Sequence, residues 1–188
     1  MSNRKLVIKA ALAMFAGLGI STTGWGASPQ TPTFNVTSTV VQNCAVATTS
    51  NVAFGNYDPI SAQTTGNNLY TSGSVVVKCT KGSPSVKIDL GVGSTGLSGT
   101  SYRQMTDGTD KLQYQLYKTG DAPNVACTGT ESVIWGTAIT GGADVEPSAS
   151  DWTNGTSSNT FNICGVLLGG QNVEAGTYTD TVTATITY

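Results

Sequence analysis

Alternation of apolar and polar residues is the clearest pattern in this chain, and it is strongest at the C-terminal end. Every odd position from Thr177 to Thr187 is threonine. The even positions are Tyr178, Asp180, Val182, Ala184, Ile186 and Tyr188. A period of two places one set of side chains on the core and the other in water or in a polar contact. The pattern predicts a strand over residues 177–188 that starts after the turn residue Gly176.

Shorter β-like runs occur along the rest of the chain, separated by stretches rich in Gly, Pro, Asn and Ser. Outside the N-terminal 26 residues, no segment has a convincing helical period. The predicted strands cover residues 69–80, 85–90, 111–118, 133–135 and 160–168. Several short strands between turn signals, without an internal repeat, predict one all-β domain built as an antiparallel sandwich.

The first residues have the composition of a signal peptide. A basic start precedes an apolar run over residues 10–20, which is shorter than the roughly 20 residues that a membrane-spanning helix needs. The small residues Gly24 and Gly26 suit cleavage before Ala27. We expect residues 1–26 to be a signal peptide and the chain to be exported, with a retained membrane anchor as the alternative.

Charge and residue types argue against several classes of function. Without the three basic residues of the signal, 6 Lys and Arg face 11 Asp and Glu, which gives a net charge of −5. A mildly acidic chain without basic clusters argues against nucleic acid as a partner. The chain has no histidine, which removes Ser-His-Asp and Cys-His catalysis. We therefore expect no enzymatic activity, no metal and no cofactor.

The cysteines of an exported chain indicate disulfides. Their even number predicts two bridges among Cys44, Cys79, Cys127 and Cys164. Zinc binding is the competing interpretation, but the spacings match no zinc motif and histidine is absent. Three connectivities are open. We favour Cys44–Cys79 and Cys127–Cys164, because each closes a loop of about 35 residues and constrains the unfolded chain by roughly 3–4 kcal/mol.

Two other kinds of site are weighed from the residues alone. Asp107 and Asp110 are the residue types of a glycoside hydrolase pair, although both lie in a predicted loop. Trp135 and Trp152 are candidates for a sugar-stacking surface. The simpler interpretation places one tryptophan in the core and the other in a loop.

The segment before Cys44 also alternates. Phe34, Val36 and Val40 share one face, with the small polar Ser38 between them. Taken alone, this periodicity predicts that residues 33–44 form the first strand of the sandwich.

Several motifs, in order along the chain, resemble the spore coat protein U family, which includes subunits of archaic, Csu-type chaperone–usher pili. The N-terminal motifs are Asn43-Cys44, Phe54-Gly-Asn-Tyr-Asp-Pro59 and Gly73-Ser-Val-Val-Val-Lys-Cys79-Thr80. The C-terminal motifs are Leu112-Gln-Tyr-Gln-Leu-Tyr117, Ile134-Trp-Gly136 and the threonine-rich ending from Gly176. Together they cover nearly all of the chain after the signal.

The resemblance implies an incomplete immunoglobulin-like antiparallel sandwich that is completed by a donor strand from another subunit. In the family, a periplasmic chaperone first fills the groove of the missing strand. At an outer-membrane usher, the N-terminal strand of the next subunit replaces it by β-augmentation. Because one subunit's strand enters another's groove, the contact is heterologous and produces an open fibre.

The resemblance also assigns roles to the two ends of the chain. It implies a donor extension over residues 27–41 before a domain over residues 42–188. The donor side chains are expected to be Phe34, Val36, Ser38 and Val40. The groove edge that a chaperone grips is expected at Val182, Ala184, Ile186 and Tyr188.

The function implied is that of a shaft or adaptor subunit of a cell-surface fimbrium, exported through the periplasm. It would support adhesion and biofilm formation as a building block. Its expected partners are a periplasmic chaperone, an outer-membrane usher and other pilus subunits. A secreted spore-coat-type structural protein and a carbohydrate-binding β-sandwich are the alternatives.

Overall fold

The computed structural model describes residues 26, 29–153 and 158–188. The chain divides into two units, Met1–Ser38 and Thr39–Tyr188. In the first unit, residues 29–38 have no regular secondary structure and are exposed. The expected signal peptide lies outside the described residues apart from Gly26, as does the expected mature start at Ala27.

The unit Thr39–Tyr188 is built from strands. They are β1 (Cys44–Ser50), β2 (Leu69–Cys79), β3 (Lys87–Leu90), β4 (Leu97–Ser98), β5 (Tyr102–Thr106), β6 (Lys111–Lys118), β7 (Ile134–Trp135), β8 (Gly142–Ala143), β9 (Asn159–Leu167) and β10 (Ala184–Thr187). One 3₁₀ turn, η1 (Ala149–Asp151), precedes β9. Within the described ranges, no helix is long and apolar enough to cross a membrane.

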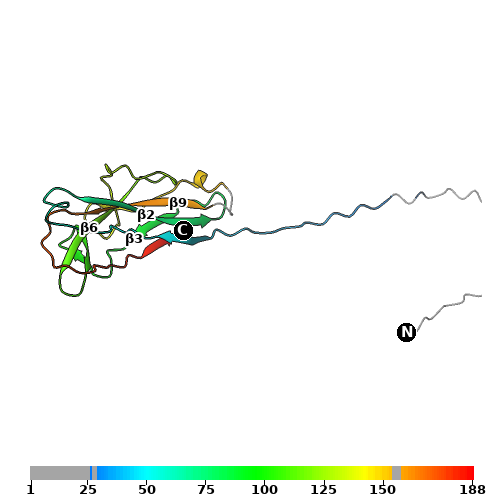
Figure 1. The fold of residues 1–188 in the computed structure, drawn as a ribbon. Helices are drawn as coiled ribbons and strands as arrows, with labels where there is room; N and C mark the ends of the chain where they lie inside the picture. Colours follow the sequence, from blue (N-terminus) through cyan, green and yellow to red (C-terminus); the bar gives the residue numbers. More distant parts are fainter. Residues whose placement is uncertain (1–25, 27–28, 154–157) are drawn as a thin grey trace, which may run out of the picture. The chain divides into compact units, whose positions relative to one another are not determined.

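These strands form two sheets, which confirms the predicted all-β fold (Figure 1). The larger sheet has the order β1-β2-β9-β6-β5-β4, with β7 beside β6 and β8 beside β7. β3 and β10 pair antiparallel as a second, two-stranded sheet. All neighbours are antiparallel except the short pair β7 and β8.

The hydrophobic core lies between the two sheets. The larger sheet contributes Val75, Val77, Leu112, Tyr114, Leu116, Phe161, Ile163 and Leu167. The strand β3 contributes Ile88 and Leu90 from the opposite layer. Burying one such large apolar side chain stabilises the fold by roughly 1.5–3 kcal/mol.

Five of the predicted strands are found within two residues of their predicted ends, and the range of β6 matches its prediction. The strands β1, β4, β5 and β8 were not predicted. The edge strand β1 shows why, because Ala45 and every residue after it in the strand is exposed. A strand without a buried face leaves no apolar alternation in the sequence.

The predicted strand over residues 177–188 is wrong in length, because the regular strand is only β10. The alternation itself is present: even positions from Tyr178 to Ile186 are half-buried and odd positions are exposed. Thr179 exchanges two backbone hydrogen bonds with Thr106. Since β3 ends at Leu90, residues 177–183 have no continuous partner strand there and form only scattered backbone bonds.

The prediction of a first strand over residues 33–44 is also wrong. Residues 29–43 carry no strand, and β1 begins at Cys44. The apolar side chains of this segment are unusually exposed, at 86% for Phe34, 85% for Val36 and 81% for Val40. Their alternation therefore has no packing partner within the described residues.

Candidate functional site

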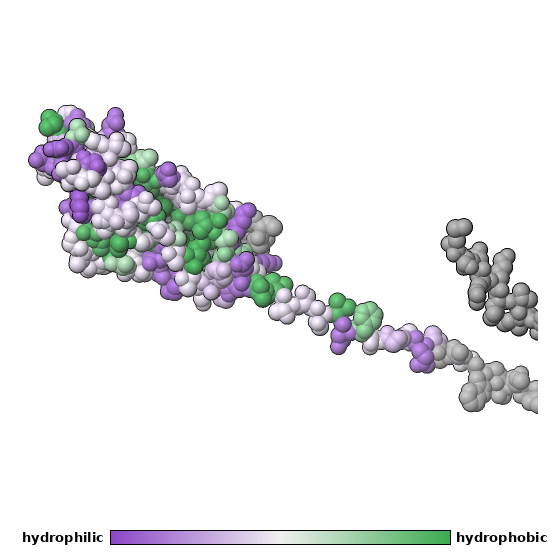
Figure 2. Space-filling view, turned by 90° about the horizontal axis from the view of Figure 1, so that it is seen from below, coloured by the Kyte–Doolittle hydropathy of each residue, from purple (hydrophilic) through white to green (hydrophobic). Residues whose placement is uncertain are grey.

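A large groove with an apolar floor opens on one face of the domain. It has a volume of about 1140 Å³. Its floor is formed by the inward faces of both sheets, through Val75, Leu90, Met105, Leu112, Tyr114, Leu116, Ile163 and Leu167. Figure 2 shows apolar side chains gathered on this face of the domain. We call residues 49–57 the first rim and residues 172–184 the second rim.

The first rim crosses the larger sheet over two glycines. A Cβ on Gly165 would lie 2.5 Å from Cγ1 of Val52 and 3.0 Å from Cζ of Phe54. A Cβ on Gly73 would lie 2.6 Å from the carbonyl oxygen of Ser50. The two glycines therefore allow Val52 and Phe54 to lie directly on the sheet as one wall of the groove.

The peptide groups of the first rim are mostly free. The carbonyl oxygen of Ala53 accepts a hydrogen bond of 3.0 Å from Oγ1 of Thr71. Residues 51–57 form no backbone-to-backbone hydrogen bond with any other described residue. Unpaired peptide groups beside a sheet are able to pair with an added strand.

The second rim is paired on one side only. The carbonyl oxygen of Thr183 accepts from the amide of Gly91, and that of Thr181 accepts from the amide of Ser94. Thr185 continues this register opposite Asp89 of β3. Along an extended strand, successive peptide groups point to opposite sides. The peptide groups of the even residues 178–186 therefore point away from β3 toward the free side.

The even residues of the second rim also supply its apolar face. Val182 and Ala184 line the groove, and both are only half-buried. Ile186 is half-buried on the same face, and Tyr188 is 52% exposed at the end of the chain. The structure thus brings Val182 and Ala184 to the groove, with Ile186 and Tyr188 extending the same face beyond it.

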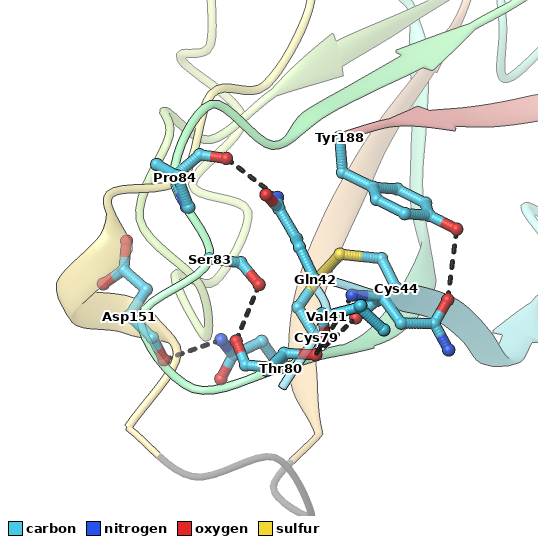
Figure 3. The surroundings of a disulfide bond; sticks show 11 residues. Val41, Gln42, Cys44, Cys79, Thr80, Ser83, Pro84, Asp151 and Tyr188 are labelled. Atoms are coloured by element: carbon cyan, nitrogen blue, oxygen red, sulfur yellow. Dashed lines mark hydrogen bonds between the residues drawn. A yellow bond between two sulfur atoms is a disulfide. The ribbon is translucent and has the colours of Figure 1, made fainter. Parts of the chain in front are cut away.

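Two hydrogen bonds connect the segments that flank the rims, one at each end of the groove. At one end, the hydroxyl of Tyr188 donates to Oδ1 of Asn43 at 3.1 Å, next to the Cys44–Cys79 disulfide (Figure 3). At the other end, the amide of Gln171 donates to the hydroxyl oxygen of Tyr57 at 2.8 Å. Between these two links, no hydrogen bond joins the described residues of the rims.

Both disulfides are present, which confirms the prediction of disulfide bonding. Cys44 pairs with Cys79 at the start of β1, with a Cα–Cα distance of 4.1 Å. Cys127 pairs with Cys164 of β9 at 5.6 Å. The first bridge fixes the chain at the point where it enters the domain.

A carboxylate interrupts the apolar face of the second rim. Oδ1 of Asp180 accepts from Oγ of Ser94 at 2.8 Å and from the amides of Thr95 and Thr181 at 3.0 and 2.8 Å. Oδ2 accepts from the hydroxyl of Tyr114 at 2.6 Å. Partial burial opposes ionisation of Asp180, but these hydrogen bonds outweigh it and lower the pKa of the carboxyl group.

Tyr114 is the matching neutral donor. Burial, together with its hydrogen bond to Asp180, raises the pKa of the Tyr114 hydroxyl above its ordinary value. The pair is therefore a carboxylate and a phenol at neutral pH, and both residues line the groove. Sequence reasoning did not assign a role to Asp180, although it is the one charged residue of the even positions in the C-terminal alternation.

The other candidate sites have structural roles. Oδ1 of Asp107 accepts from the amides of Thr109 and Asp110, so it closes the turn between β5 and β6. Trp135 and Trp152 are 0% and 2% exposed. Trp135 lies in the core strand β7 and Trp152 in the loop after η1, as interpreted, but Trp152 is buried as well, so neither ring forms an exposed sugar-stacking surface. Among the described residues, no group of acidic or cysteine side chains is arranged to hold a metal.

Comparison with known families identifies the chain. The model of the family described as Spore Coat Protein U domain matches residues 30–185. The chain belongs to this family. Proteins of the Spore Coat Protein U family are structural and non-enzymatic.

Individual relatives support the same placement. Protein U of Myxococcus xanthus is 32% identical over 150 residues, covering 72% of this chain and 70% of the relative. The fold is similar to a chain in the crystal structure of the CsuC–CsuE chaperone–tip adhesion subunit pre-assembly complex from the archaic chaperone–usher Csu pili of Acinetobacter baumannii, with a TM-score of 0.51 and 20% identity. That match covers 80% of this chain and 40% of the other. It places this Spore Coat Protein U domain among immunoglobulin-like folds.

Proposed function

We propose that this protein is a structural subunit of a chaperone–usher surface pilus, and that its groove accepts a donor strand from another polypeptide. The observation that carries this proposal is that both rims have peptide groups without a backbone partner on the side of the groove. The first rim has free peptide groups, and the second rim turns the peptide groups of its even residues to the open side. A strand between them would pair on both sides, as in β-augmentation.

The apolar surface of the groove supports the same conclusion. The core residues Leu112, Leu116 and Leu167 form its floor, and the rim residues Val182 and Ala184 are left half-buried. A donor strand with alternate apolar side chains would cover them. Each buried Val or Phe would contribute roughly 1.5–3 kcal/mol, so such a strand completes both the sheet and the core.

Membership of the Spore Coat Protein U family and the likeness to a Csu pilus complex supply the biological setting. The protein is exported through the periplasm and reaches the cell surface. A periplasmic chaperone fills the groove first, and the N-terminal segment of the next subunit replaces it at an outer-membrane usher. Residues 27–41 are the donor extension, and the domain from residue 42 is the acceptor. The subunit belongs to the shaft or an adaptor and supports adhesion and biofilm formation as a building block.

The donor role is tested by removing residues 27–41 from the exported chain, with its chaperone co-expressed. The variant is expected to remain a chaperone-bound monomer that accepts a donor strand and donates none. Long SDS-resistant polymers of the deletion variant would contradict the donor assignment. A point variant sharpens the test: Val36→Asp should abolish polymers, whereas Asn35→Asp places the same charge on the opposite face and should not.

A secreted spore-coat-type structural protein is the second candidate, because the family is described as Spore Coat Protein U domain and Protein U of Myxococcus xanthus is a 32% identical relative. The two functions differ in their need for a chaperone. The pilus function predicts that the chain expressed alone in a periplasm aggregates or is degraded, and that a cognate chaperone makes it soluble. A stable solitary monomer would favour the coat protein and argue against the incomplete fold.

A further inference from the structure

Among the even positions 178–184 of the second rim, which face the core, Asp180 is the one charged residue. Oδ2 of Asp180 accepts a single hydrogen bond, from Tyr114, whereas Oδ1 accepts three. A carboxylate oxygen has two lone pairs, so Oδ2 retains capacity for another donor. The neighbouring even residues, Tyr178 and Val182, offer apolar surface. A strand whose side chains face these even positions therefore fits best with one small hydroxyl or amide donor among apolar side chains.

The segment before β1 has that composition. Phe34, Val36 and Val40 alternate with exposed polar residues, and Ser38 is the polar member of the same face. An antiparallel alignment that sets Ser38 opposite Asp180 fixes every other pair. Those pairs are Val36 with Val182, Phe34 with Ala184, and Val40 with Tyr178. The largest donor side chain then lies opposite the smallest residue of the rim, and each end of the alignment is apolar.

A parallel alignment through the same polar pair fits less well. It places Phe34 beside Gly176, in the bend that precedes the rim, and leaves Ala184 without a partner. The antiparallel alignment keeps all four donor side chains beside the half-buried even positions 178–184. Size and polarity thus select one direction and one register.

This register requires a second molecule. Cys44 lies at the end of the groove marked by the Asn43–Tyr188 hydrogen bond. Residues 178–188 extend over roughly 33 Å at about 3.3 Å per residue. The four residues from Val40 to Cys44 reach at most ~14 Å. Val40 therefore cannot reach Tyr178 of its own domain while Cys44 remains in β1.

We propose that residues 34–40 of a second copy of this chain fill the groove in antiparallel register, with the hydroxyl of Ser38 donating to Oδ2 of Asp180. This inference rests on the proposed function and adds the partner and the alignment. The pair Ser38–Asp180 fixes the register. A shift of the donor segment by two residues along the second rim would place the Ser38 hydroxyl against apolar surface and a valine against the Asp180 carboxylate. Leaving a buried polar group unpaired opposes such a shift.

Disulfide cross-linking tests directly which donor residue lies opposite which residue of the second rim. In the full chain, Val36→Cys combined with Val182→Cys should give covalent polymers under mild oxidation, because directly opposite residues have Cβ atoms about 4.5–5.5 Å apart. Val36→Cys with Ile186→Cys is the matched control, four residues out of register, and should give none. Cross-links in the control but not in the first pair would overturn the register. Intramolecular cross-links in place of polymers would overturn the second copy as the occupant.

A charge test examines the polar pair itself. Ser38→Asp should slow polymerisation at least ~tenfold, because like charges that face each other across an interface oppose association. Thr39→Asp carries the same charge on the opposite face and should leave the rate unchanged. Adding Asp180→Asn to Ser38→Asp should restore the rate. Equal rates for Ser38→Asp and Thr39→Asp would overturn the polar pair.

The proposed function is judged separately in the same assay. Wild-type polymers that disappear on deletion of residues 27–41 support it, whichever register the cysteines report. Failure of the register pair with intact donor dependence would therefore overturn only this inference. Polymers that persist without residues 27–41 would overturn both.

Discussion

Nη2 of Arg103 donates a hydrogen bond of 2.6 Å to the carbonyl oxygen of Trp135, and both residues are 0% exposed. The same guanidinium donates to the carbonyl oxygens of Leu90 and Gly91 and to Oε1 of Gln115. Burial lowers the pKa of Arg103 to about 10, which leaves it charged at neutral pH. One side chain thus joins β7 and β6 to the end of β3, the strand that supports the second rim.

Replacing Arg103 with methionine should therefore destabilise the domain, although the volume is largely kept. The carbonyl oxygens of Leu90, Gly91 and Trp135 would lose their donor, and each unsatisfied buried group costs about 1–3 kcal/mol. The expected loss is on the order of 3–5 kcal/mol in the free energy of unfolding. Urea unfolding of the assembled protein, followed by tryptophan fluorescence, measures it. An unchanged unfolding midpoint would show that the carbonyl groups find other donors.

Gly165→Ala should displace the first rim without damaging the rest of the sheet. Its Cβ would lie 2.5 Å from Val52, which is too close for any real contact. The expected result is weaker binding of a donor strand, seen as polymers that dissociate in SDS at a lower temperature. Gly91→Ala is the matched control, since its Cβ would meet nothing closer than 3.5 Å. Equal effects of the two substitutions would argue against a role of the first rim in strand binding.

The strict alternation of apolar and polar residues was the feature of the sequence that predicted most of the strands. The buried faces of β2, β6 and β9 repeat with period two, so these strands were predictable from apolar residues alone. β1 and β5 were not, because Ala45 is exposed in an edge strand and Arg103 occupies an inward position. A buried arginine at an inward position interrupts the apolar and polar alternation from which a strand is predicted. Its acceptors are main-chain oxygens from three segments, and only the folded chain brings them together.

The candidate site was predictable in part. The family resemblance placed a groove edge at Val182, Ala184, Ile186 and Tyr188; Val182 and Ala184 line the groove, whereas Ile186 and Tyr188 lie beyond it. The sequence of the first rim did not predict a groove wall, because the position of this segment depends on its contacts with Gly73 and Gly165, which follow later in the chain. The role of Asp180 was also hidden. Its partners Ser94 and Tyr114 lie 86 and 66 residues away.

Acid should loosen the second rim through Asp180. The folded protein holds the pKa of this carboxyl below its ordinary value of 3.8. A carboxylate of this kind stabilises the folded state above its unfolded pKa, and the contribution is lost as the pH falls through the lower, folded value. As the pH falls below about 5, wild-type stability should therefore fall more steeply than that of Asp180→Asn.

The unfolding midpoint in urea at a series of pH values measures this difference. Asp58 and Asp107 contribute equally to both proteins; hydrogen bonds from Ser61 and from the amide of Thr109 lower their pKa values. Parallel pH profiles for the wild type and Asp180→Asn would show that Asp180 adds no stability to the rim.

Gly93→Ala should expel Asp180 from its position and so separate the polar pair from the groove. A Cβ on Gly93 would lie 2.0 Å from Oδ2 of Asp180, and the residue has a φ of +94°, where side chains are strained. Gly96→Ala is the matched control, because Gly96 has a φ of +80° with nothing within 4 Å of the added Cβ. Both substitutions carry the backbone cost of about 1 kcal/mol or more, but only Gly93→Ala also displaces the carboxylate. The expected result is a larger loss of stability and slower polymerisation for Gly93→Ala than for Gly96→Ala, measured by urea unfolding and by polymer yield. Equal losses would mean that the close approach of Asp180 to Gly93 does not hold the second rim in place.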